Sequence, residues 1–187
     1  MAKTMNSQPN ILVTGANGFV GRALRQKLDE CRRFSTTGAV RSDMHASNSA
    51  GNIVVGNLDE NTNWQPALAG KDVVIHTAAR AHIMEDLSST PLMEYRKVNV
   101  KGTLNLARQA AEFGVRRFVF ISSIKVNGER TPKNQPFVPE DTPAPKDAYG
   151  ISKMEAEKGL RALAAETDME LVIIRPPLVY GPGVKGN

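Results

Sequence analysis

The chain has 187 residues, and 24 Lys and Arg against 19 Asp and Glu give it a formal net charge of +5. This length corresponds to one domain. With 41% hydrophobic and 23% charged residues, and no apolar run near the roughly 18 residues of a membrane span, the composition excludes a disordered chain and predicts no membrane partner. The basic residues are scattered and aromatic residues make up 5%, so we also expect no nucleic-acid partner.

The cysteine and histidine content predicts where the protein works and what it does not bind. Cys31 is the single cysteine, so no internal disulfide can form, and the first ten residues lack the apolar core of a signal peptide. Both features predict a cytoplasmic location. His45, His76 and His82 have no spacing typical of metal ligands, so we expect no metal site.

Strand-like and helix-like segments alternate along the chain. Apolar, β-branched runs predict strands at 10–14, 52–55, 72–77, 117–122 and 171–175, with a weaker strand at 36–41. Apolar residues at helical spacing, such as Val20, Leu24 and Leu28, predict helices between them. Strands that are apolar throughout and separated by helices predict a parallel sheet buried on both faces. We therefore expect a doubly wound α/β (Rossmann) domain over residues 10–187, after a flexible segment 1–9.

Two stretches differ from this pattern. Residues 42–52 are polar, and residues 127–147 contain five prolines without any periodicity. The second stretch is long enough to predict a functional loop.

Three glycines follow the first predicted strand. Gly15, Gly18 and Gly21 have the spacing GxxGxxG in the sequence ILVTGANGFVGRAL. A tight strand-to-helix turn, a phosphate close to the backbone and close helix packing each favour glycine, and the helix N-terminus attracts the pyrophosphate. The pattern predicts a dinucleotide site. The alternative is a glycine turn that only packs.

The end of the second predicted strand leaves the choice of dinucleotide open. An acidic residue about 20 positions after the glycine loop binds the ribose of NAD, whereas an arginine there accommodates the 2′-phosphate of NADP. Arg41 lies at this position and Asp43 follows it. Arg41 therefore favours NADP, although a solvated charge at a strand end is the alternative interpretation.

Tyr149 and Lys153 are four residues apart at the start of a predicted helix, in DAYGISKMEAEKGL. Residues at this spacing share one helix face. A phenol has a pKa near 10, so proton transfer near neutrality needs a nearby cation, and we expect Lys153 to lower the Tyr149 pKa. A simple amphipathic pair is the alternative, which the glycine loop makes less favourable.

Six motifs in order give the chain a resemblance to a known family. They are TGANGFVG (14–21), HTAA (76–79), NVKGT (99–103), ISS (121–123), YGISK (149–153) and RPPLVYGPG (175–183). Together they resemble the extended short-chain dehydrogenase/reductases, in the branch of NAD-dependent nucleotide-sugar epimerases, dehydratases and 4-ketoreductases. The resemblance runs from Asn10 to the last residue.

The resemblance implies a role for each motif residue. Tyr149 would be the acid/base, Lys153 its partner, Ser123 a donor to the sugar oxygen, and Asn99 a support for the helix and a water relay. The implied cofactor contacts are Gly15, Asn17, Gly18, Phe19, Val20, Gly21, Arg41, Asn57, Leu58, Thr77, Ala78, Ala79, Arg80, Tyr149, Lys153 and Pro176.

Three features depart from the family pattern. Asn57 replaces the usual aspartate after the third strand, and Asn127 replaces an aromatic residue in SSIKVNG. The second change is similar to members that act on UDP-linked N-acetylhexosamines and their 4-keto-6-deoxy derivatives. The family usually has about 300 residues, so we expect this chain to be a fragment that lacks most of the C-terminal substrate region and is inactive alone.

The resemblance implies an enzyme that transfers hydride between NAD(P) and C4 of a UDP-linked hexose. The favoured function is that of a UDP-glucose or UDP-N-acetylhexosamine 4-epimerase, and the full-length enzyme would be a homodimer. An NADPH-dependent UDP-4-keto-6-deoxy-hexosamine reductase is one alternative. A non-catalytic dinucleotide sensor is another, although a sensor would not need Tyr149, Lys153 and Ser123 together.

Overall fold

The computed structural model describes residues 8–42, 51–81, 90–131 and 133–184. The strands are β1 (Asn10–Thr14), β2 (Ser35–Val40), β3 (Asn52–Val54), β4 (Val73–His76), β5 (Arg117–Ile121) and β6 (Glu170–Ile174). The helices are α1 (Phe19–Cys31), α2 (Gln65–Leu68), α3 (Pro91–Tyr95), the π-helix η2 (Arg96–Gly102), α4 (Thr103–Glu112), the 3-10 helix η3 (Ile124–Val126) and α5 (Ala148–Ala165). Each predicted strand forms within two residues of its expected bounds.

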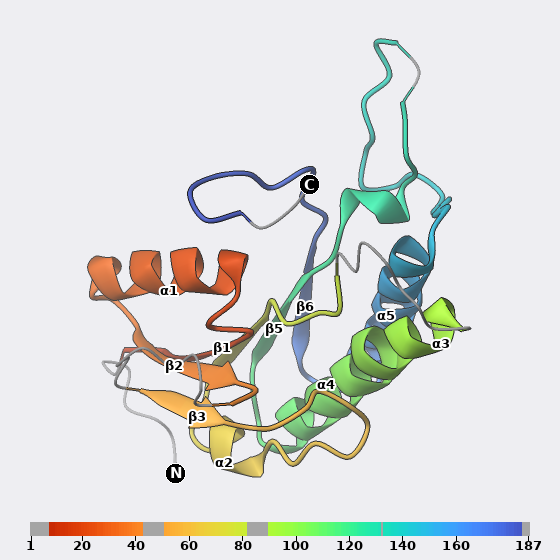
Figure 1. Ribbon diagram of the computed structural model, residues 1–187. Helices are drawn as coiled ribbons and strands as arrows, with labels where there is room; N and C mark the ends of the chain where they lie inside the picture. Colours follow the sequence, from red (N-terminus) through yellow and green to blue (C-terminus); the bar gives the residue numbers. More distant parts are fainter. Residues whose placement is uncertain (1–7, 43–50, 82–89, 132, 185–187) are drawn as a thin grey trace.

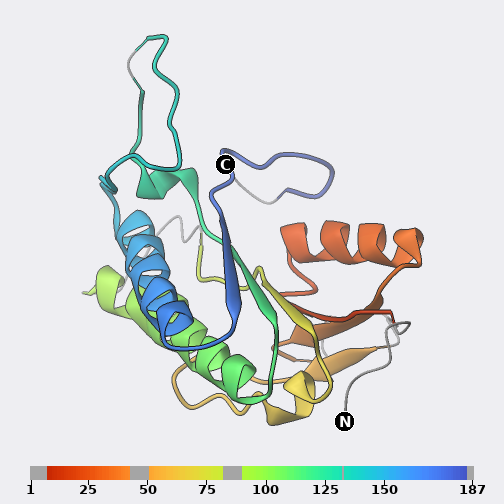
Figure 2. The ribbon, with the colours of Figure 1, turned by 180° about the vertical axis from the view of Figure 1, so that it is seen from behind.

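All six strands lie in one parallel sheet with the order β3-β2-β1-β4-β5-β6. Helix α1 lies on one face, and α3, η2, α4 and α5 lie on the other (Figures 1 and 2). The expected doubly wound fold is therefore confirmed. The chain leaves β1 toward β2 on one side and reaches β4 on the other, and doubly wound sheets bind ligands in the crevice outside the carboxyl ends of the strands at such a point.

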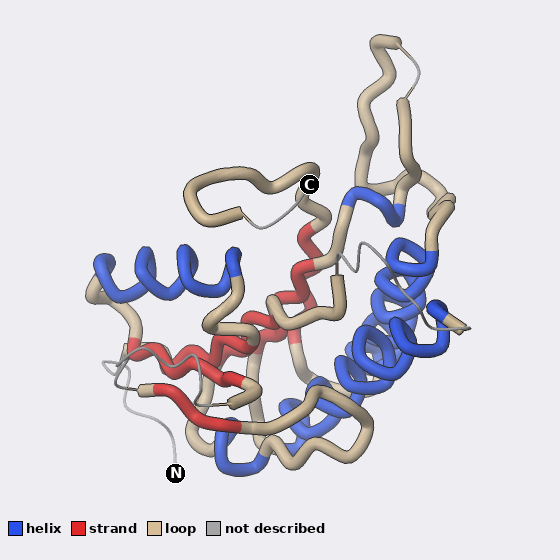
Figure 3. Tube along the Cα trace, in the orientation of Figure 1, coloured by secondary structure: helices blue, strands red, loops and turns tan. Residues whose placement is uncertain are grey.

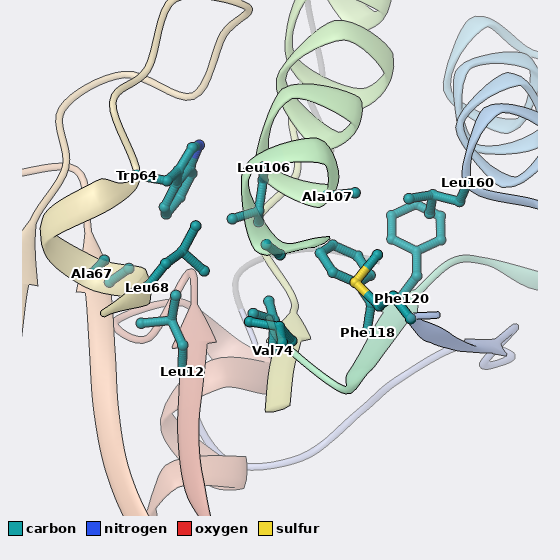
Figure 4. Packing of buried hydrophobic residues seen from close by; sticks show 14 of the residues in the cluster. Leu12, Trp64, Ala67, Leu68, Val74, Leu106, Ala107, Phe118, Phe120 and Leu160 are labelled. Carbon is teal, nitrogen blue, oxygen red and sulfur yellow. The ribbon is translucent and has the colours of Figure 1, made fainter. Parts of the chain in front are cut away.

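The main core lies between the sheet and helices α2, α4 and α5. Leu12, Val74 and Phe118 are neighbours in the strand register, and none of them is exposed to solvent. Trp64 and Leu106 cover them from the helical layer (Figure 4). Burying a large apolar side chain contributes about 1.5–3 kcal/mol, so this face holds much of the fold's stability.

The opposite face of the sheet is covered over only part of its width. Val13, Ile75, Val119 and Val172 form one row across β1, β4, β5 and β6. Val13 beneath α1 is 0% exposed, whereas Val172 is 39% exposed. The expectation that every strand is buried on both faces is therefore wrong for β5 and β6, because among the described helices α1 alone lies on this face and it packs against β1 and β2.

Part of the N-terminal segment that was expected to be flexible is held by hydrogen bonds. Gln8 and Pro9 belong to the segment expected to be flexible, yet the Gln8 side chain donates to the Arg32 carbonyl and the Pro9 carbonyl accepts from the Ser35 amide. Residues 1–7, together with Asp43, His45 and His82, lie outside the described residues.

Within the described ranges, no helix combines the length and apolar character needed to cross a bilayer.

The proline-rich stretch is a loop, as predicted. Between η3 and α5 its described residues form no helix or strand, and the loop projects away from the body (Figure 3). It is attached at its base, where the Ala144 amide donates to the Val126 carbonyl and the Asn127 side chain donates to the Val138 carbonyl.

The partly covered sheet face generates the first prediction. Val172 and Ile174 are 39% and 46% exposed and neighbour further exposed apolar residues after β6. Contiguous exposed apolar surface promotes association, so we expect the double variant Val172→Lys, Ile174→Lys to shift the chain toward monomer in sedimentation-velocity ultracentrifugation. The melting temperature should fall only modestly, because more than a third of each residue is already exposed. A wild-type chain that is monomeric at 100 µM would contradict this prediction.

Candidate active site

The glycine turn after β1 is dictated partly by the fold itself. Gly15 has φ +66°, and a Cβ there would lie 2.8 Å from the Ala78 amide nitrogen. A Cβ on Gly21 would lie 2.2 Å from the Gly15 carbonyl oxygen. Neither position tolerates a side chain, so these two glycines are explained by close packing of β1, α1 and the segment after β4.

Gly18 is different, because its backbone conformation does not require glycine. Its φ of −75° suits any residue, and an added Cβ would make one tight contact, 3.0 Å from the Gly15 carbonyl oxygen. Gly18 is the N-cap of α1, whose end has no side-chain cap and no acidic residue in its first turn. Such a helix end attracts anions, so the cradle fits the pyrophosphate of a dinucleotide, beside Asn17, Phe19 and Val20.

The segment after β4 is tied to the glycine turn by hydrogen bonds. The Thr77 hydroxyl donates to the Thr14 carbonyl at 2.6 Å, and the Ala78 amide donates to the Thr14 hydroxyl at 3.4 Å. The Arg80 amide donates to the Asn99 side chain at 2.8 Å. These bonds fix the backbone at the crevice, next to the exposed Ala79.

The remaining predicted cofactor residues lie at the same edge of the sheet. Arg41 and Asn57 are exposed just after β2 and β3, where the adenosine end of a dinucleotide would lie in this fold. Leu58 packs against Gly102, since a Cβ on that glycine would lie 2.9 Å from the leucine Cγ. The Pro176 carbonyl, after β6, accepts from the Ile124 amide. The structure thus gathers the predicted cofactor residues along one edge.

Tyr149 lies in the first turn of α5, which Asp147 caps by accepting from the Gly150 amide at 2.6 Å. The Ser123 side chain lies close enough to act on its hydroxyl, in the sense that favours the phenolate. Burial, followed by the negative charge of Asp147, raises the Tyr149 pKa, and the opposing effects of Lys125 and Ser123 are smaller. Lys125 is itself paired with Asp147 at 2.6 Å. The structure therefore brings the predicted tyrosine and serine together.

Lys153 does not act on Tyr149 as the sequence predicted. Its ammonium nitrogen lies 3.9 Å from the centroid of the Phe120 ring, a cation–π contact, and the residue is 1% exposed. Burial lowers the Lys153 pKa to about 7, against an opposing effect of Glu157. Lys153 is not among the groups that shift the Tyr149 pKa in this structure, since its ammonium faces Phe120 of β5, and burial is the largest influence on the phenol.

His76 has a structural role. It is completely buried at the end of β4, and its two ring nitrogens are bonded to the hydroxyls of Thr14 at 2.6 Å and Thr103 at 2.9 Å. Burial, and then the charge of Lys153, lowers the His76 pKa to about 3. The ring is therefore neutral near pH 7. In the described part of the chain, no three His, Cys, Asp or Glu side chains come together as metal ligands would.

Sequence reasoning missed a buried carboxylate that organises the site. Glu157 is 1% exposed and accepts hydrogen bonds from Ser122 at 2.6 Å and from two Arg175 nitrogens at 2.9 and 2.6 Å. Burial disfavours its charge, but the bonds from Arg175 and Ser122 outweigh burial and hold the Glu157 pKa below its usual value. Glu157 follows Lys153 by four residues and therefore shares its helix face. This spacing could have identified Glu157 from the sequence.

Asn127, the residue in the usual aromatic position, is also explained by this network. Its side-chain oxygen accepts from Arg175 at 3.0 Å, and its amide nitrogen donates to the Val138 carbonyl at 3.2 Å. Asn127 thus connects the end of β6 to the proline-rich loop.

Asn99 lies in η2, 1% exposed. Its side-chain nitrogen donates to the Ser152 hydroxyl and to the Arg80 carbonyl, both at 3.0 Å. Asn99 therefore connects α5 with the segment after β4, which agrees with its expected role as a support for the helix.

The buried lysine generates a stability prediction. The Lys153 pKa is 10.5 ordinarily and about 7 in the fold, so the unfolded chain binds more protons between these pH values. The lysine therefore destabilises the fold fully below about pH 7, and this destabilisation is relieved as the pH rises toward 10.5. We expect Lys153→Met to raise the melting temperature at pH 6–7 by at least about 3 °C.

The control is Lys158→Met, which changes an exposed lysine on the same helix and should leave the melting temperature unchanged. Melting curves from pH 6 to 9 should also show a smaller rise of stability with pH for Lys153→Met than for wild type. A Lys153→Met chain that melts below wild type at pH 6.5 would show that the cation–π contact outweighs desolvation.

Comparison with known proteins agrees with this architecture. A UDP-glucose 4-epimerase from Vibrio cholerae is 51% identical over 180 residues, which make up 95% of this chain and 54% of that protein. The solved structure of MoeE5 in complex with UDP-glucuronic acid and NAD is 30% identical, has a TM-score of 0.81, and matches 94% of this chain and 57% of its own. The chain spans about half the length of the curated relatives it matches.

A second curated relative is N-acetyl-alpha-D-glucosaminyl-diphospho-ditrans,octacis-undecaprenol 4-epimerase from Escherichia coli O157:H7, 33% identical over 95% of this chain and 51% of that protein. Residues 11–187 match the family model described as NAD dependent epimerase/dehydratase family. This range covers nearly the whole sequence and includes every motif on which the resemblance was based. The chain belongs to the NAD dependent epimerase/dehydratase family.

Proposed function

We propose that this chain is the dinucleotide-binding and acid/base half of a UDP-hexose 4-epimerase that uses NAD. The observation that carries the proposal is the position of Tyr149 next to Ser123, at the sheet edge that also holds the Gly18 cradle. The 51% identity to a UDP-glucose 4-epimerase supports the same substrate class. The NAD present in the MoeE5 structure supports the choice of cofactor.

The residues divide the work of the reaction. The glycine turn and residues 77–80 would hold NAD, which would supply the hydride acceptor for oxidation of C4 and the hydride donor for its reduction on the other face of the sugar. Tyr149 takes the proton from the C4 hydroxyl and gives it back, while Ser123 holds the same oxygen by a hydrogen bond. Because burial raises the Tyr149 pKa in this structure, the phenol stays protonated until a cation or dipole near its hydroxyl favours the phenolate.

Lys153 is the residue suited to supply that charge when cofactor is bound. With a pKa near 7, it changes its protonation state at small energetic cost, and an added hydrogen-bond acceptor near its nitrogen would favour the charged form.

We include a homodimeric assembly and a cytoplasmic location in the proposal. Cys31 supports the location, because it is exposed and the sequence contains no second cysteine.

The cradle generates a binding prediction. Gly18→Val places a side chain in the space proposed for the pyrophosphate, and we expect the Kd for NAD to rise at least tenfold in titration calorimetry, about 1.4 kcal/mol. Some loss of stability is also expected, because the valine Cβ would lie 3.0 Å from the Gly15 carbonyl oxygen, so the Kd is measured on a variant whose melting curve shows that it is folded. The matched comparison is Gly21→Ala, whose Cβ would lie 2.2 Å from the Gly15 carbonyl oxygen and should unfold the chain.

Undiminished NAD affinity in folded Gly18→Val would place the cofactor elsewhere. The same titration with NADP tests Arg41, since a lower Kd for NADP than for NAD would assign its guanidinium to the 2′-phosphate and favour the reductase alternative.

The activity is tested in a chimera, because the chain matches about half of its relatives. Residues 10–184 replace the matching half of the Vibrio cholerae enzyme, and conversion of UDP-glucose to its C4 epimer is followed by NMR. We expect the chimera to be active and Tyr149→Phe to slow it by about 10²–10⁴-fold, the usual effect of a positioned acid/base. UDP-glucose affinity should stay within a factor of about two, because one hydroxyl contributes little to binding. Full activity of Tyr149→Phe would refute the assigned role.

A further inference from the structure

Tyr95 is a buried aromatic residue that none of the motifs explains. It ends α3 and is 8% exposed. On one side the guanidinium carbon of Arg80 lies 5.5 Å from the centroid of its ring. On another side the ring meets that of Tyr149, with centroids 6.1 Å apart and an interplanar angle of 63°. Tyr95 thus lies between the segment after β4 and the proposed acid/base.

A second connection joins the same two places through hydrogen bonds. The Asn99 side chain bonds both backbone polar groups of Arg80, at 2.8 and 3.0 Å. It also donates to the Ser152 hydroxyl, which in turn donates to the Tyr149 carbonyl at 2.7 Å. The contacts form a closed loop through Arg80, Tyr95, Tyr149, Ser152 and Asn99.

We propose that Tyr95 is a positioning residue, whose ring restrains the orientation of the Tyr149 side chain. This proposal rests on the proposed function of Tyr149. The backbone of Tyr149 is fixed by the helix and by Ser152, but neither bond restrains rotation of its side chain. The edge-on contact with Tyr95 supplies that restraint.

The loop also gives Tyr95 a fixed orientation of its own. A cation over one ring face restricts how the ring can tilt, and the Arg80 backbone is held in turn by Asn99. Residues 77–80 after β4 carry predicted cofactor contacts. A movement of this segment would therefore act on Tyr149 in two ways, on its ring through Tyr95 and on its backbone through Asn99 and Ser152.

The experiment uses NMR of the 187-residue chain labelled at tyrosine Cζ, which reports ionisation of the phenol, and at Cε, which reports flipping of the ring. The chain has three tyrosines, so three Cζ signals are expected, and Tyr→Phe variants assign the signals. In Tyr95→Leu we expect the Tyr149 pKa to fall toward its ordinary value, since water reaches the phenol and burial is the main cause of its raised pKa. The Tyr149 ring should also flip faster. Tyr95→Phe keeps the ring and should restore slow flipping.

The control for general destabilisation is Phe118→Leu, which removes a fully buried ring from β5. It should lower the melting temperature and leave the Tyr149 signal unchanged. A Tyr149 pKa and flip rate equal to wild type in folded Tyr95→Leu would overturn the proposal, and so would a Tyr95→Phe variant that behaves like Tyr95→Leu in ring flipping.

Kinetics in the chimera separate this proposal from the proposed function. We expect Tyr95→Leu to lower kcat by about 10-fold to 100-fold, the effect of a misplaced reacting group, with KM within a factor of about two. Tyr95→Phe should recover most of kcat. If Tyr149→Phe proves fully active, the proposed function fails, whereas the NMR result still decides whether Tyr95 orients Tyr149.

Discussion

The arrangement of the site depends on one buried carboxylate, that of Glu157. It joins α5 to the ends of β5 and β6 through Ser122 and Arg175, and Arg175 continues the network to Asn127. A buried charge that loses its partner costs about 3–5 kcal/mol, so helix, strands and loop base are held in one arrangement. Tyr149 on α5 and Ser123 after β5 meet because these elements cannot move independently.

The titratable groups of the site are buried. Burial lowers the stability of the fold, but it also makes the protonation of these groups sensitive to a nearby charge. Burial lowers the pKa of His76 and Lys153 and raises that of Tyr149. Each shift opposes the charged form, and near pH 7 the cost to folding falls on Lys153, because His76 and Tyr149 are mostly neutral in the unfolded chain as well. Buried groups respond strongly to an added charge or dipole because the surroundings screen weakly. Holding such groups in a buried site lowers the stability of the fold. A charged ligand bound there would change their protonation strongly.

The sequence predicted what depends on local patterns. Strand and helix periodicity gave the parallel sheet, and glycine spacing gave the turn at Gly15 and Gly21. The direction of the Lys153 side chain could not be predicted, because helical spacing places it on a face but does not reveal Phe120 across that face. Tyr95 was missed for a related reason. Its partner Tyr149 is 54 residues away in the chain, and no periodicity records a contact between segments so distant.

The π-helix η2 lets this helical layer hold one additional residue without turning the residues on either side of it. A π-turn holds one residue more than an α-turn, each amide bonding to i−5 instead of i−4. Loss of one residue between Arg96 and Gly102 would leave a regular α-helix, and the wider turn would simply close. The part that begins at Pro91 would keep nearly its present orientation relative to α4. Asn105 and Gln109 would keep their bonds to the Thr62 carbonyl, and Tyr95 would still face Tyr149. A residue lost from a helix without such a turn would instead rotate one part against the other by about 100°, so η2 is the place in this layer where a change of chain length leaves the two tyrosines together.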